Sequence, residues 1–190
     1  MRNKIKDLTY MSICLSLLIV CSKISFSIGP IPLTLQTFSV ILISLILKWK
    51  KAFLVFLIYI IIGLCGIPVF STGGGFDYIF RPSFGFILGF LLSSLVCGLY
   101  SSKYKFINYF KGILGLLIID FTGLIYMYFI MNYYLDLGKS IAYIIDVGLT
   151  PFLIKDIISV ILAVTVYERI KISITDDLKL NTKKKNAPIN

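Results

Sequence analysis

The stretch GILGLLIIDFTGLIYMYFIM, residues 112–131, contains one charged side chain, Asp120, in 20 residues. An apolar helix of about 20 residues crosses the hydrocarbon core of a bilayer, so this stretch predicts a transmembrane helix. The composition of the whole chain agrees, since 58% of its 190 residues are hydrophobic and 15% are charged. The sequence therefore predicts an integral membrane protein, surrounded by the lipid bilayer.

Five further apolar runs accompany this one along the chain. The six predicted spans cover residues 8–26, 33–47, 52–67, 84–100, 112–131 and 150–167. We expect a single all-α membrane domain over residues 1–190, a bundle of six transmembrane helices with no separate soluble domain. The basic start and first run also resemble a signal peptide, but the run is long enough to span and no clear cleavage site follows it.

The basic residues predict how the bundle is oriented. Fifteen of the 19 Lys and Arg residues fall before the first span, between the second and third, between the fourth and fifth, or after the sixth. The other four are Lys23, Arg81, Lys139 and Lys155. The positive-inside rule then places both termini and a basic tail, residues 168–190, in the cytoplasm of a multi-pass cell-membrane protein. No aromatic-basic face accompanies these charges, so we predict no nucleic-acid partner.

Several classes of chemistry are disfavoured by the residues present. The chain has no histidine, the commonest metal ligand and general base. Its four cysteines lie in apolar runs without the spacing of a zinc site or a disulfide framework. The glycines at 73–75 lack the Lys-Ser/Thr pair of a phosphate-binding loop. We therefore predict no enzyme, no metal site and no cofactor.

Polar residues collect at the predicted outer ends of the spans. The segment TPFLIKDIIS, residues 150–159, places Lys155 and Asp156 where the sixth span begins. Charges near the hydrocarbon usually face a cavity or a partner, so Asp156 is a candidate ligand contact. Thr34 and Gln36 lie at the outer end of the second span, after two prolines that a helix interior would exclude. The three glycines at 73–75 fit a mobile lid or a plain flexible loop equally.

Asp120 has two interpretations. Counted from residue 112, it lies near the middle of the bilayer, where it either bonds a neighbouring helix or belongs to an ion or proton path. An enzyme using Asp120 and Asp156 as an acid/base pair would need both in one site. Their predicted depths differ by roughly half a bilayer, which argues against this enzyme.

A series of motifs in order resembles the BioY family. They are PLTLQT (32–37), Tyr59, Gly63, GIPVF (66–70), Gly73-Gly74, PSFGF (82–86), Gly89, and Pro151-Phe152 followed by Asp156. BioY proteins are biotin-specific substrate-capture subunits, or S components, of energy-coupling-factor vitamin importers. The resemblance implies a six-helix bundle that binds biotin from outside and docks on a transmembrane coupling protein with two ATPase subunits. An alanine version of the Ser12 and Ser16 spacing docks the coupling subunit in that family, which implies the same role here.

The resemblance also assigns a pocket. Asp156 would accept a hydrogen bond from the ureido ring, and either Lys155 or Arg81 would hold the carboxylate tail; an extended ligand favours Arg81. The other implied ligand-binding residues are Thr34, Gln36, Phe70, Gly73, Phe84, Phe86 and Ser159. Two departures touch this pocket. The basic residue is displaced, since Lys155 stands where the family has glycine and Ser159 where it has lysine, and the glycine segment lacks an asparagine that some relatives carry. An S component for a different vitamin is therefore the alternative.

Overall fold

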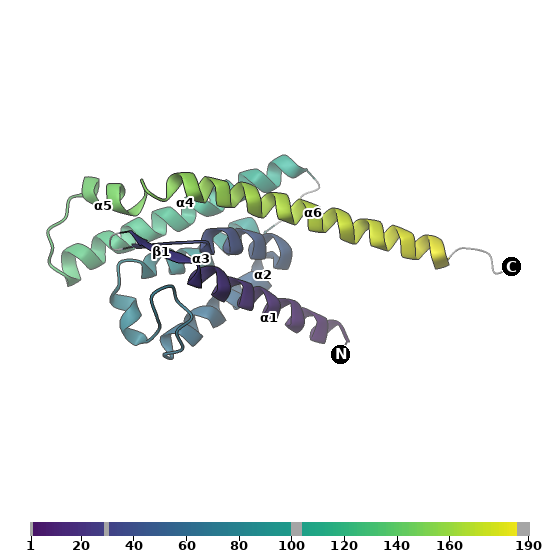
Figure 1. Cartoon of the computed structure of the whole chain (residues 1–190), viewed down its shortest axis with the longest axis horizontal. Helices are drawn as coiled ribbons and strands as arrows, with labels where there is room; N and C mark the ends of the chain where they lie inside the picture. Colours follow the sequence, from purple (N-terminus) through teal and green to yellow (C-terminus); the bar gives the residue numbers. More distant parts are fainter. Residues whose placement is uncertain (1, 29–30, 100–103, 186–190) are drawn as a thin grey trace.

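The computed structural model describes residues 2–28, 31–99 and 104–185, with side chains at 4–26, 31–99 and 104–172. Its helices are α1 (Arg2–Lys23), α2 (Gln36–Leu64), α3 (Phe84–Cys97), α4 (Lys105–Phe129), α5 (Ile141–Gly148) and α6 (Leu153–Lys185). A 3-10 helix, η1 (Phe76–Phe80), precedes α3, and a π-helical segment, η2 (Ile130–Tyr134), follows α4. The chain is mostly helical, as the sequence predicts (Figure 1).

Helix α2 consists of two limbs that meet at Lys48. The backbone of Lys48 has a φ of 61°, which residues other than glycine rarely adopt. The next residue, Trp49, donates its backbone N–H to the carbonyl of Gly98 at 3.1 Å. A Cβ atom on Gly98 would lie 2.2 Å from the Trp49 nitrogen. The break therefore rests on a close approach to the end of α3 that glycine permits.

Each predicted span overlaps one helical segment. Residues 8–26 overlap α1, residues 33–47 and 52–67 overlap the two limbs of α2, and residues 84–100, 112–131 and 150–167 overlap α3, α4 and α6. Two described helices, Lys4–Lys23 and Lys105–Tyr134, are long and apolar enough to cross a membrane. The bent pair Ile141–Gly148 and Leu153–Ile172, with a 47° angle, would be a third if it forms one span. The count of six spans remains a prediction.

A β-hairpin joins α1 to α2. Strand β1 (Ser25–Ile28) pairs antiparallel with β2 (Ile31–Thr34), and Phe26 lies opposite Leu33. Pro32 sits in β2, where the missing N–H is tolerated because neither strand is central in a sheet. The expectation of a purely helical fold is wrong at this point. Helix α2 accordingly begins at Gln36, whereas the predicted second span began at residue 33.

Glycines allow α3 and α4 to pack closely. A Cβ atom on Gly89 of α3 would lie 2.8 Å from the Cα of Ile119, and one on Gly115 of α4 would lie 2.3 Å from the Cys97 sulfur. Lipid tails are as apolar as a protein core, so helix association in a membrane depends on such close packing. The small residues of α4 thus bring its inner face against α3.

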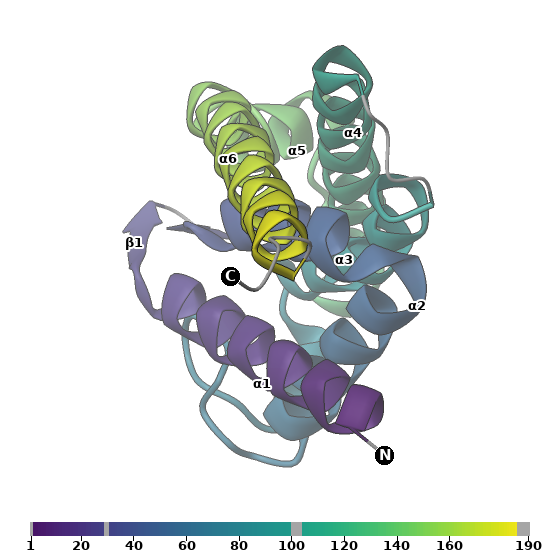
Figure 2. The same cartoon turned by 90° about the vertical axis from the view of Figure 1, so that its right-hand side faces the viewer.

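The outer surface of the bundle is apolar. Large hydrophobic side chains are exposed along α4 and α6, among them Phe106 at 80%, Phe121 at 69% and Ile154 at 76%. An apolar surface of this extent is typical of contact with lipid. Viewed from one end, α1 and α4 lie on opposite sides of the bundle (Figure 2). The start of α1 and the end of α6 project from the same end of the bundle, opposite the hairpin and α5 (Figure 1).

Candidate ligand-binding site

A cavity of about 50 Å³ lies where the hairpin meets α2, α3, α4 and the start of α6. Its polar lining consists of Thr34, Gln36, Thr37, Ser71, Tyr78, Ser83, Asp120, Lys155 and Asp156. Its apolar lining consists of Ile31, Pro32, Phe86, Ile87, Phe90, Ile119 and Phe152. Polar and apolar residues thus both contribute to the lining, and the share of polar residues is higher than in most small-molecule sites.

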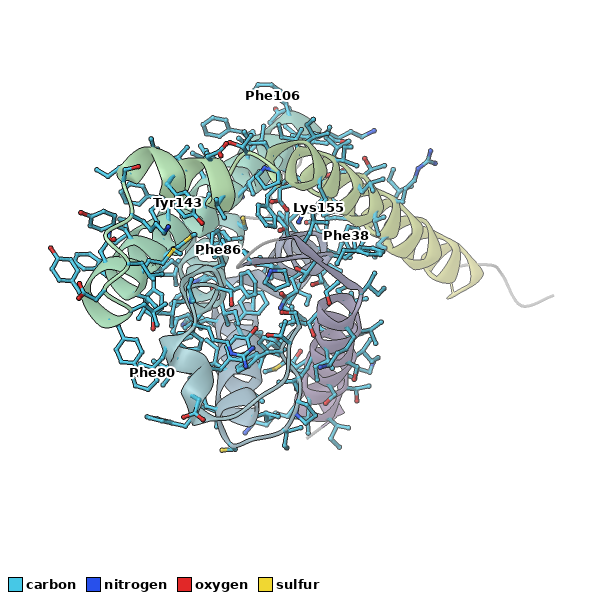
Figure 3. All side chains as sticks on the ribbon, turned by 60° about the vertical axis from the view of Figure 1, so that its left-hand side comes forward. Phe38, Phe80, Phe86, Phe106, Tyr143 and Lys155 are labelled. Carbon is cyan, nitrogen blue, oxygen red and sulfur yellow. The ribbon has the colours of Figure 1, made fainter. Side chains whose placement is uncertain are left out.

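Lys155 and Asp156 enter this cavity from the first turn of α6. The Lys155 ammonium forms an ion pair with the Asp156 carboxylate and donates a hydrogen bond to the carbonyl of Thr34 at 2.8 Å. Figure 3 shows Lys155 pointing from α6 toward the interior of the bundle. Asp156 is only 5% exposed, and a buried carboxylate of this kind is retained when a charge partner accompanies it. The two residues therefore form one anchored pair that ties α6 to the hairpin.

Asp120 reaches the same cavity from α4, which corrects the expectation that it lies far in depth from Asp156. The helix begins at Lys105 rather than at residue 112, so Asp120 lies ~22 Å from its start at 1.5 Å per residue. Among the described residues Asp120 forms no hydrogen bond or ion pair. The site thus holds two carboxylates and one lysine. Asp120 also borders an apolar groove on the outer side of α4 and α6.

A chain of hydrogen bonds leads from the cavity to the glycine-rich segment, residues 66–78. Thr34 donates its hydroxyl to Gln36 Oε1 at 3.1 Å, and Gln36 Nε2 donates to the Tyr59 hydroxyl at 2.9 Å. Tyr59 in turn donates to the carbonyl of Val69 at 3.1 Å. Tyr59 is fully buried, so its hydroxyl needs both partners. The side chain of Tyr59 therefore joins the PLTLQT motif to the GIPVF motif.

The three candidate phenylalanines occupy different places. Phe86 lines the cavity. Phe70 and Phe84 lie outside its lining, in the aromatic core beside it, where the ring of Phe70 lies 4.4 Å from that of Tyr78 and 6.5 Å from that of Phe84. Phe70 also covers Gly63, whose added Cβ would lie 2.1 Å from its ring. Phe70 and Phe84 support the wall that Tyr78 presents to the cavity.

Arg81, Gly73 and Ser159 also lie outside the lining. The Arg81 guanidinium donates to the Thr72 hydroxyl at 2.6 Å and lies 4.9 Å from the centre of the Tyr78 ring. Arg81 thus contacts Tyr78, a residue of the cavity lining, without lining the cavity itself. Gly73 has a φ of 129° and a backbone bridge to Phe70, while Ser159 is buried in α6.

The glycine-rich segment is held in place by α1 and α2. Ser22 donates to the carbonyl of Val69 at 2.5 Å, and Lys23 donates to that of Phe70 at 2.7 Å. The Gly75 N–H donates to the Gly63 carbonyl at 2.7 Å. Any opening of this segment must break these bonds. Whether it acts as a lid stays a prediction.

Ser12 and Ser16 lie on the surface of α1, far along the chain from the cavity. Both are exposed, and the Ser16 hydroxyl bonds back to the Ser12 carbonyl at 3.0 Å. Their small side chains leave a shallow face on the helix, available for another helix to approach.

Sequence reasoning missed several lining residues. Tyr78 and Ser71 belong to the glycine-rich segment that the sequence singled out, so their proximity to the site was a usable signal. Ser83 falls within the PSFGF motif, which was likewise a usable signal. Phe90 carries no distinguishing signal in the sequence. Within the described residues, no group of three His, Cys, Asp or Glu side chains is placed to hold a metal ion.

A cavity with polar and apolar walls, enclosed by apolar helices, is the arrangement expected of a membrane protein that binds a small, partly polar molecule. Comparison with known proteins identifies its relatives. The chain is 37% identical over 169 residues to a probable biotin transporter BioY from Pyrococcus horikoshii, covering 88% of this chain and 98% of the relative. It is 34% identical over 160 residues to the biotin transporter BioY of Thermotoga maritima, covering 82% and 90% of the two chains.

The model of the BioY family matches residues 1–176, and the chain belongs to this family. The fold agrees with a solved structure, that of the S-component for biotin from an ECF-type ABC transporter. The two share a TM-score of 0.79 at 22% identity, over 90% of this chain and 93% of the other.

Proposed function

We propose that this protein is the biotin-binding S component of an energy-coupling-factor importer. The observation that carries the proposal is the cavity, in which buried carboxylates and an amide face apolar walls. Biotin has a ureido ring with two N–H donors and a carbonyl, an apolar bicycle and chain, and a carboxylate tail. The relatives named as biotin transporters support this ligand over a different vitamin. BioY proteins are transporter subunits, which argues against the acid/base enzyme despite the shared cavity of Asp120 and Asp156.

Asp156 accepts a hydrogen bond from a ureido N–H in this proposal. A hydrogen bond to a charged group contributes about 1.5–3 kcal/mol. Lys155 remains paired with Asp156 while it does so, because a carboxylate has enough acceptor sites for both. The pair then stays neutral when the ligand enters. Thr34, at the end of β2, and Gln36, at the start of α2, supply polar contacts near the ring.

Arg81 holds the carboxylate tail. Lys155 already has an anionic partner, whereas the described contacts of Arg81 are the neutral Thr72 hydroxyl and the Tyr78 ring. Separating Lys155 from Asp156 to serve the tail would leave a buried carboxylate unpaired. The remaining candidates support the walls of the cavity and do not line it themselves. They are Gly73, Phe70, Phe84 and Ser159. Phe86 contacts the ligand directly.

Ligand entry requires the surrounding elements to move apart. The cavity of about 50 Å³ is well below the roughly 300–1,000 Å³ of sites for drug-sized ligands. The glycine-rich segment is the element that moves, with positive φ angles at Gly66, Gly73 and Gly75. Its bonds to Ser22, Lys23 and Tyr59 then re-form over the ligand.

The bundle crosses the membrane six times, with both termini and the basic tail in the cytoplasm. The common end from which α1 begins and α6 ends supports an even number of crossings (Figure 1). The two limbs of α2 supply the second and third spans. Tail side chains beyond residue 172 lie outside the described residues. Ser12 and Ser16 dock the transmembrane coupling protein, which works with two ATPase subunits.

The test is equilibrium binding of labelled biotin to the purified full-length protein. We expect an affinity tighter than micromolar, and about a tenfold or greater loss in Asp156→Asn. Asp136→Asn, an exposed carboxylate outside the cavity, is the matched control and should bind normally. Wild-type binding weaker than micromolar would favour another vitamin. Equal affinity of Asp156→Asn and wild type would remove Asp156 from the contacts.

A further inference from the structure

A second hollow lies on the outer face of the bundle, between α4 and α6. This α4–α6 groove has a volume of about 830 Å³, and its walls are almost entirely apolar. Ile113 and Leu117 of α4, which are 50% and 55% exposed, form one side. Ile157 and Ile161 of α6, which are 50% and 49% exposed, form the other. The groove therefore opens sideways toward the hydrocarbon.

One end of the groove continues into a cationic pocket of about 280 Å³. Tyr109 lines both hollows, and its hydroxyl bonds that of Thr165 across the two helices at 3.0 Å. Lys105 and Arg169 line the pocket from α4 and α6. Both are exposed, and neither forms an ion pair with a described residue.

The one carboxylate of the cationic pocket is already engaged. Glu168 accepts a hydrogen bond from Asn108 at 2.5 Å and lies 3.9 Å from the Lys171 ammonium. Its side chain is buried, whereas those of Lys105 and Arg169 are exposed, and it forms no ion pair with either of them. The charge that Lys105 and Arg169 present at the surface is therefore not cancelled by Glu168.

The combined shape matches a molecule with one anionic end and a long apolar chain. On α4 the groove runs from Tyr109 to Leu124, which is ~22 Å at 1.5 Å per residue. One leaflet of hydrocarbon is about 15 Å deep, so an extended acyl chain fits along the groove. We propose that the α4–α6 groove and the cationic pocket together bind an anionic phospholipid, with its phosphate on Lys105 and Arg169.

A partner helix is a less suitable occupant of this groove. Helices that associate within a membrane present small residues to one another. Here the glycines of α4 face inward, since a Cβ atom on Gly112 would lie 2.7 Å from Val160 and one on Gly123 would lie 2.4 Å from Phe86. The groove itself presents bulky side chains, which keep a second backbone at a distance. A flexible acyl chain adapts to such a surface.

The position along the bundle fits the same ligand. The cationic pocket lies toward the end at which α4 begins and from which α6 projects, where the chain termini also lie (Figure 1). In Figure 3 the neighbouring side chain Phe106 points outward from α4 at this end. The cytoplasmic leaflet carries anionic lipids that attract basic residues near its surface.

The test is native mass spectrometry of the full-length protein after incubation with equal amounts of phosphatidylglycerol and phosphatidylcholine. We expect retained phosphatidylglycerol adducts, reduced about tenfold in Lys105→Gln/Arg169→Gln, since each basic residue adds to the attraction. Lys4→Gln/Lys6→Gln removes the same charge from exposed positions on α1 and should retain the adducts. An equal loss in both variants, or equal binding of the two lipids by wild type, overturns the proposal.

A second variant tests the acyl-chain part of the site. Leu117→Trp fills the α4–α6 groove at an exposed position, so the bundle should remain folded, as elution and thermal unfolding will check. We expect it to lose phosphatidylglycerol although both cations remain. If Leu117→Trp retained the lipid but lost copurification with a coupling protein, the groove would belong to a protein partner and the lipid proposal would fail.

Discussion

Asp120 of α4 and Asp156 of α6 line one cavity, with Lys155 as the single basic side chain among the residues of its lining. The three groups differ in their contacts. Asp156 has an ion pair with Lys155, whereas Asp120 has no polar partner among the described residues. The two carboxylates should therefore respond differently to neutralisation.

Asp156→Asn should destabilise the protein more than Asp120→Asn. Loss of Asp156 leaves the half-buried ammonium of Lys155 without its paired anion, at a cost of up to about 3 kcal/mol, whereas loss of Asp120 removes a carboxylate without a partner. Thermal unfolding of both variants in the same detergent, without ligand, measures the difference. A larger loss of stability in Asp120→Asn would show that Asp120, not Asp156, is the paired group.

A comparison of ligands with and without the tail charge can identify the basic residue that holds the carboxylate tail. Biotin and its uncharged amide differ in the tail alone, so their affinity ratio reports the contact with the carboxylate. We expect Arg81→Gln to lower this ratio by about tenfold or more, while Lys155→Gln weakens both ligands and preserves it. The measurement is competition against labelled biotin. If Lys155→Gln abolishes the preference and Arg81→Gln keeps it, the assignment of the tail is reversed.

Gly63→Ala should destabilise the aromatic core beside the cavity. The added Cβ would lie 2.1 Å from the ring of Phe70, and overpacking of this kind costs about 1–3 kcal/mol. Phe70→Leu makes room, so the double variant should lose less stability than the sum of the two single variants. Thermal unfolding of the wild type, the two single variants and the double variant measures this double-mutant cycle. Strict additivity would mean that the two residues do not interact.

Ser12→Leu/Ser16→Leu should block assembly with the coupling protein and spare biotin binding. Leucine fills the shallow face of α1 and keeps a second helix at a distance. Tyr10→Trp is the matched control, because it adds bulk at an exposed position about 160° around the same helix from Ser12 and about 120° from Ser16. Copurification with the coupling protein measures assembly. Normal copurification of the serine variant would exclude this face as the docking surface.

Hydropathy was sufficient to locate the longer helical segments, because a run of apolar residues has few alternatives in a membrane, but the six predicted spans did not include α5. It did not reveal the β-hairpin, since Phe26 and Leu33 are as apolar as their helical neighbours. The break at Lys48 was predicted as a loop from its three lysines, but its contact with Gly98 is tertiary. Such a contact leaves no trace in local composition.

The candidate site was predictable where a residue broke the apolar pattern. Lys155, Asp156, Thr34 and Gln36 stood out in this way, and all four line the cavity. Burial cannot distinguish an aromatic cavity wall from core packing, so the sequence could not separate Phe86 from Phe70 and Phe84. The depth of Asp120 was misjudged because residues 105–111 were assigned to a loop, although α4 already includes them.

Asp120 borders both the ligand cavity and the α4–α6 groove. At this point, among the described residues, the side chain of Asp120 alone belongs to the walls of both the cavity and the lipid-facing groove. If the α4–α6 groove holds a lipid and the cavity holds the proposed ligand, a change at the groove can reach the cavity through Asp120. An outward shift of α4 caused by the surrounding lipid would then change the affinity of the cavity for its proposed ligand.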